Sequence, residues 1–121
     1  MILSAMIAFS VISINSLSTL GIPITKEEAV EISKNSELVK EGIATFSCFT
    51  VEANYYNSSL VEQMKKGHTR EMYEKVPEGH SIWKVIWAFT YGGLMVGYTV
   101  IVIVDFETGT LIHETKGAGF G

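Results

Sequence analysis

The last third of the chain alternates bulky apolar side chains with others, and this two-residue period indicates extended strands. One side of residues 81–91 is built from aromatic and branched side chains: Trp83, Val85, Trp87, Phe89 and Tyr91. Residues 94–104 form a second, nearly unbroken β-branched run. Gly92 and Gly93 between the two runs can adopt the positive φ angles of a tight turn. We therefore predict a β-hairpin whose second strand lies in the middle of a sheet.

A second turn extends this hairpin. Asp105-Phe-Glu-Thr-Gly109 begins with a side chain that can accept hydrogen bonds from backbone amides and ends with a residue suited to left-handed backbone. Residues 110–115 provide the next strand, and residues 116–121 are predicted as a loose tail. The C-terminal part is thus expected to be an antiparallel meander.

The segment after Pro23 has a clear helix start. Thr25 and Glu28 have the spacing of a capping box, in which each side chain accepts the backbone amide of the other residue. Apolar or small residues then recur at helical spacing as far as Ile43. Gly42 is the expected helix stop. We predict one helix over about residues 26–41, covering the apolar face of the sheet.

Residues 43–56 return to a two-residue period and predict a strand. One face of that strand would carry Ile43, Phe49, Val51, Ala53 and Tyr55. Residues 57–80 are polar, with a second capping box starting at Ser59, and indicate a short helix or an excursion. The predicted fold class is α+β: an N-terminal helix packed on an antiparallel β-sheet of about four strands, with this short helix or excursion between strands 1 and 2.

The beginning of the sequence is uncharged, because none of the nine basic and thirteen acidic residues precedes Lys26. An apolar run followed by small polar residues is typical of a signal peptide or an N-terminal membrane anchor, which we assign to residues 1–21. Residues 22–121 then form a single domain. A spanning helix over residues 2–22 and a buried first strand or helix of the domain are the alternatives.

Composition excludes several classes of protein. The formal charge of -4 and the pI near 5.3 disfavour nucleic-acid binding, which needs a basic surface. The 11% of aromatic residues argues against intrinsic disorder. A single cysteine, Cys48, cannot form an internal disulfide.

Three stretches resemble PepSY domains. Residues 24–32 are similar to the capped, acidic opening helix of that family, and residues 83–87 look like its strand with an aromatic residue followed by valine. Residues 102–112 resemble its closing hairpin with an Asp-x-x-Thr-Gly turn. The resemblance implies an extracytoplasmic, non-catalytic domain of a group that is associated with peptidase propeptides and restrains peptidases. The protein would be secreted or anchored in the cell envelope, with membrane contact only through its N-terminal segment.

No catalytic, cofactor-binding or metal-binding residues are predicted. Cys48 lies among aromatic residues and is expected to be a small buried hydrophobe. His68, His80 and His113 lack the spacing of metal ligands and are expected at the surface.

The aromatic residues of the two predicted strands exceed what a small core usually holds, so some are expected to form a binding surface. The candidate partner-binding residues are Trp83, Trp87, Tyr91, Tyr55 and Tyr56. We expect a binding module that docks a protein partner, with a peptidase as the partner class, through its sheet face or edge. One alternative is a small ligand-binding or enzymatic domain of the cystatin-like, cone-shaped type, with a pocket between helix and sheet. Another is a membrane-tethered part of a larger assembly.

Overall fold

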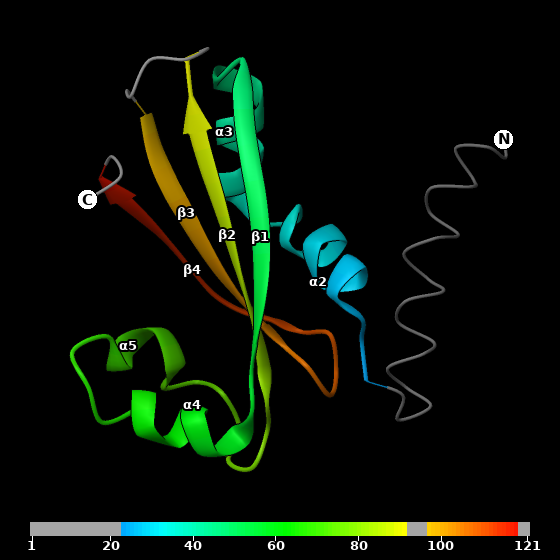
Figure 1. Cartoon of the computed structure of the whole chain (residues 1–121), viewed down its shortest axis with the longest axis vertical. Coiled ribbons are helices and arrows are strands. Elements are labelled where there is room, and N and C mark those ends of the chain that lie inside the picture. The colour runs from blue at the N-terminus through cyan, green and yellow to red at the C-terminus, as the bar shows by residue number, and fades with distance from the viewer. Residues whose placement is uncertain (1–22, 92–96, 119–121) are drawn as a thin grey trace, which may run out of the picture.

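The computed structural model describes residues 23–91 and 97–118, which form an α+β fold. Helices pack on an antiparallel four-stranded sheet of order β1-β2-β3-β4, as predicted (Figure 1). In chain order the elements are α2 (Lys26–Ser33), α3 (Glu37–Thr45), β1 (Cys48–Tyr56), α4 (Ser58–Met64), α5 (Arg70–Tyr73), β2 (Ile82–Thr90), β3 (Gly97–Asp105) and β4 (Leu111–Ala118). The predictions for residues 1–22, 92–96 and 119–121 lie outside the described residues. Among the described helices, none has the length and apolar character needed to cross a bilayer.

The strands form a simple antiparallel meander. The β1–β2 ladder is unbroken from Cys48 opposite Thr90 to Tyr56 opposite Ile82, and the β2–β3 ladder is equally regular. The β3–β4 ladder contains a register shift. Because Lys116 pairs with Val100, β4 continues beyond the predicted strand, and the predicted tail is wrong for residues 116–118.

The alternation along β2 separates two differently covered faces. Trp83, Val85, Trp87 and Phe89 lie on the face that packs against α2 and α3, as the sequence predicts. The opposite face is covered by α4 and α5 around Ile82, at one end of the sheet. Figure 1 shows α3 and the α4–α5 pair at opposite ends of the sheet, with α2 beside β1.

One buried hydroxyl connects the helical layer to the sheet. The Ser33 hydroxyl donates to the carbonyl of Val30 at 2.6 Å and accepts the indole N–H of Trp87 at 2.9 Å. Ser33 and Trp87 are both fully buried or nearly so. Leaving a buried indole N–H without a partner costs about 1–3 kcal/mol, so this bond allows the largest buried side chain to sit in the core.

The helix predicted over residues 26–41 is divided into α2 and α3, so the prediction is wrong in its extent. Its start is confirmed: the Thr25 hydroxyl accepts the Glu28 amide at 3.1 Å, and the Glu28 carboxylate accepts the Thr25 amide at 2.8 Å. The division falls between Ser33 and Ser36, whose hydroxyls bond to nearby backbone groups. Serine side chains compete in this way with the hydrogen bonds of a continuous helix.

Ser36 starts α3 and ties it to the far edge of the sheet. Its hydroxyl accepts the amide of Val39 at 3.2 Å and donates to the carboxylate of Glu114 on β4. The same carboxylate accepts the amide of Leu38 at 3.2 Å. Since a helix N-terminus favours a negative charge, Glu114 helps to fix the position of α3.

Gly42 lies inside α3, which corrects its prediction as a helix stop. The helix continues to Thr45, so residues 43–45 are helical although the sequence places them in a strand. A Cβ atom on residue 42 would lie 2.4 Å from ring carbons of Phe89. The glycine is therefore required for the close approach of α3 to the sheet rather than for a turn.

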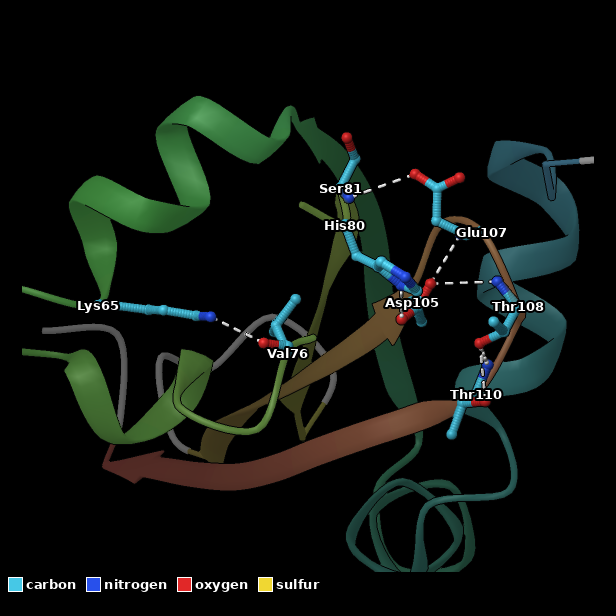
Figure 2. Close-up of polar contacts among 8 residues, drawn as sticks. All are labelled: Lys65, Val76, His80, Ser81, Asp105, Glu107, Thr108 and Thr110. Carbon is cyan, nitrogen blue, oxygen red and sulfur yellow. Dashed lines mark hydrogen bonds and ion pairs between the residues drawn. The ribbon is translucent and has the colours of Figure 1, made fainter. Parts of the chain in front are cut away.

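Two short helices occupy the predicted excursion between β1 and β2. The side chain of Asn57 accepts the amide of Leu60 at 2.9 Å and begins α4, so the predicted cap at Ser59 is wrong. Asn57 is the N-cap of α4 because its side-chain oxygen accepts the backbone amide three residues ahead. Lys65, just after α4, donates to the carbonyl of Val76, just after α5, at 2.7 Å (Figure 2).

We expect Gly42→Ala to lower the free energy of unfolding, measured by urea denaturation. Alanine improves helix propensity by about 1 kcal/mol, but overpacking a core costs about 1–3 kcal/mol, and Phe89 is fully buried. Gly67→Ala is the matched control, because the nearest atom to its added Cβ lies at 3.8 Å. Equal stability of the two variants would contradict the close approach at residue 42.

We expect the stability to fall with pH above 10 because of Tyr73. Burial, followed by the charge of the neighbouring Tyr56, raises the pKa of Tyr73 from its ordinary value of 10.0 to about 12. Between these values the unfolded chain has lost a proton that the folded chain retains, so rising pH favours unfolding. Urea denaturation at several pH values should show that the free energy of unfolding falls more steeply with pH for wild type than for Tyr73→Phe. The exposed control Tyr55→Phe should keep the pH dependence of wild type, and parallel curves for wild type and Tyr73→Phe would refute this role of Tyr73.

Candidate functional site

Three of the predicted partner-binding aromatics are packing residues. Trp87 is buried, and the half-buried Trp83 donates its indole N–H to the carbonyl of Ile24 at 3.1 Å. Tyr56 is half-buried and stacks on Tyr73, with ring centroids 6.3 Å apart. These side chains hold segments of the fold together and leave little surface for a partner.

The other two predicted residues are exposed but lie far apart. Tyr55 is 47% exposed and Tyr91 is 45% exposed. Tyr55 pairs with Trp83 near the start of β2, whereas Tyr91 follows the end of β2 and packs on Phe46 with ring centroids at 4.5 Å. The five predicted residues therefore do not form one surface.

β1 carries a row of exposed apolar side chains that includes Tyr55. Phe49 is 45% exposed and Val51 is 37% exposed, and both lie on the face of β1 that carries Tyr55. Ala53, between Val51 and Tyr55 on the same face, is buried. We call Phe49, Val51 and Tyr55 the edge row. The two-residue period of the sequence predicts that they share a face. Their exposure follows from the position of β1 at the edge of the sheet, which the period does not reveal.

The rings of the edge row rest on the core. Phe49 lies 5.3 Å from Trp87, and Tyr55 lies 4.8 Å from Phe106, measured between ring centroids. The Tyr55 hydroxyl also donates to that of Ser81 at 3.2 Å. Side chains held in this way lose little conformational freedom when a partner binds, which favours them as interface anchors.

The outer side of β1 is open within the described part of the chain. An edge strand directs alternate N–H and C=O groups away from its sheet, and no other described segment pairs with those of β1. The other edge strand, β4, has a register shift and the charged side chains Glu114 and Lys116, two features that discourage pairing. β1 is thus the better template for an added strand.

A groove of about 270 Å³ lies between α2 and β1. Its lining residues are Lys26, Glu27, Val30, Glu31, Val51, Glu52 and Ala53. Ligand pockets usually measure about 300–1,000 Å³, so this groove suits a single side chain better than a cofactor. It adjoins the edge row through Val51.

Asp105 is the centre of a polar cluster at the turn after β3 (Figure 2). Its buried carboxylate accepts the amides of Glu107 at 2.7 Å and Thr108 at 3.1 Å, and Gly109 has a φ of 77°, as the predicted turn requires. Nδ1 of His80 lies 2.8 Å from the other carboxylate oxygen. The last contact is between residues 25 positions apart and has no local sequence signal.

This cluster has the arrangement of a structural tie. A histidine that activates a nucleophile needs that nucleophile within hydrogen-bond reach. The neighbouring hydroxyl, that of Ser81, instead accepts a hydrogen bond from Tyr55. The Asp105 carboxylate therefore joins His80, in the segment before β2, to the turn after β3, and it satisfies its own hydrogen-bonding needs by doing so.

The remaining reactive side chains lie apart from one another. Cys48 is exposed, which corrects the prediction that it is buried, because its strand is at the sheet edge. His68 is exposed, whereas His80 and His113 are half-buried. Within residues 23–91 and 97–118, no group of three or more His, Cys, Asp or Glu side chains is placed to hold a metal ion.

Comparisons of the chain with protein-family models, with curated proteins and with solved structures find no match.

We expect Asp105→Ala to lower the free energy of unfolding by more than about 2 kcal/mol, because several donors around a buried carboxylate lose their acceptor. Asp105→Asn retains an acceptor for the two amides and should lose less. Glu78→Ala removes an exposed carboxylate of the preceding loop and should stay within about 0.5 kcal/mol of wild type. Urea denaturation measures all three, and a loss for Asp105→Ala no larger than for Glu78→Ala would rule out the structural tie.

Proposed function

We propose that this protein is a non-catalytic binding module that takes an extended segment of a partner protein as an added strand beside β1. The observation that carries this proposal is the edge row, three large apolar side chains exposed on an unbroken edge strand. Strand addition uses main-chain hydrogen bonds for affinity and alternate side chains for specificity. β1 offers both, since no described segment pairs with its outer backbone groups and its apolar side chains recur on one face.

The sequence supports the proposed class of partner and the proposed location. The stretches that resemble PepSY domains support a partner that is a peptidase, which the module would restrain. Residues 1–21, as a signal peptide or anchor, support an extracytoplasmic protein. The acidic net charge supports a protein partner over a nucleic acid.

A phage-displayed library of random twelve-residue peptides tests strand addition. Selection on the immobilised protein should enrich peptides that bind wild type and do not bind Val51→Lys, because a lysine on an edge strand opposes pairing and interrupts the edge row. Thr115→Lys places the same charge on the β4 edge and should bind like wild type. Circular dichroism confirms that both variants are folded.

Hydrogen exchange with one enriched peptide locates the binding. The peptide should slow exchange of amides in residues 48–56, and a version N-methylated at alternate residues should lose binding in the register that faces β1. Enrichment that Val51→Lys leaves unchanged, or protection on β4 in place of β1, would overturn the proposal.

A further inference from the structure

The groove between α2 and β1 combines an apolar floor with an acidic rim. Val30, Val51 and Ala53 supply the aliphatic surface, and Val51 also belongs to the edge row. Glu27 and Glu31, one helical turn apart, are both exposed above that floor.

We infer that this groove receives a lysine or arginine side chain of the segment that pairs with β1, an inference that rests on the proposed function. The juxtaposition that carries it is an aliphatic floor on the edge strand beneath two carboxylates of α2. Lysine and arginine have the matching shape, since their methylene stems cover apolar surface while the charged end stays among polar groups.

The charges of the lining favour a cation. The lining residues include three acidic ones, Glu27, Glu31 and Glu52, against one basic one, Lys26. Lys34 lies 3.0 Å from Glu31 and offsets part of that charge. The Glu52 carboxylate accepts a hydrogen bond from the side-chain amide of Asn54 at 3.1 Å. We therefore assign recognition of the cation to Glu27 and Glu31.

The register of strand addition determines the neighbours of this cation. A residue opposite Val51 directs its side chain to the α2 side, into the groove. Residues two positions before and after it lie on the same face, one opposite Phe49 and the other opposite Ala53, next to Tyr55. The recognised segment is therefore extended and basic at its centre, with apolar residues two positions to each side.

Three fluorescein-labelled peptides test this inference. They share the sequence Ser-Thr-Val-Thr-X-Thr-Val-Thr-Ser, in which X is lysine, norleucine or glutamate. Fluorescence anisotropy at low salt should give a dissociation constant about two- to fivefold lower for lysine than for norleucine, the size expected of an exposed ion pair, and the weakest binding for glutamate. The preference for lysine should shrink at high salt.

Two double variants with equal charge change identify the carboxylates. In E27Q/E31Q the lysine and norleucine peptides should bind equally, while Glu28 retains the helix cap. In E37Q/E41Q, which removes two exposed carboxylates from α3, the preference should remain. Hydrogen exchange of residues 48–56 accompanies each measurement.

Each other outcome overturns a separate statement. Equal affinities of the three peptides for wild type, with β1 protected, overturn the groove's preference and leave strand addition standing. A preference that E37Q/E41Q abolishes as fully as E27Q/E31Q overturns the assignment to Glu27 and Glu31. Absence of β1 protection with all peptides overturns the proposed function itself. A dimer in sedimentation analysis that Val51→Lys abolishes would make a second copy of the chain the occupant of β1 and overturn the inference.

Discussion

The hydrogen bond from the Trp87 indole to the Ser33 hydroxyl determines where the helical layer lies on the sheet. Because Trp87 is buried, its N–H needs an acceptor, and Ser33 supplies it at the last residue of α2. This contact holds α2 next to β1, where the groove is found. The break that follows lets α3 turn toward Glu114 and press Gly42 against Phe89. The groove thus lies beside a polar contact that joins α2 to the sheet.

Two carboxylates make further connections between distant segments. Asp105 joins His80 to the turn after β3, and Glu114 joins β4 to the start of α3. Each accepts several hydrogen bonds, which reduces the cost of removing a carboxylate from water. These contacts join the loop before β2 to the turn after β3, and α3 to β4, so they stabilise the sheet to which the edge row belongs. An edge that is already ordered loses less entropy when a partner segment binds to it.

Signals carried by neighbouring residues predicted structure well except for the cap at Ser59, and features that depend on distant contacts were not predicted. The capping box at Thr25 and the turn at Asp105 are confirmed, because both consist of a side chain bonding amides two or three residues away. The single helix over residues 26–41 is wrong, because Ser36 finds a partner 78 residues away on β4. The interpretation of Gly42 fails for the same reason, since the ring that requires a glycine there belongs to β2.

The sequence by itself predicted four strands, the turn at Asp105 and which side chains share a face, because the two-residue period is a property of the extended backbone. It also supplied the resemblance on which the peptidase hypothesis rests. Only the tertiary structure decided that β1 is an edge strand, and with it that Phe49, Val51 and Cys48 are exposed while Trp87 is buried. The physical reason is that burial depends on strand order and on the helices above each strand, which arise from contacts between residues far apart in the chain.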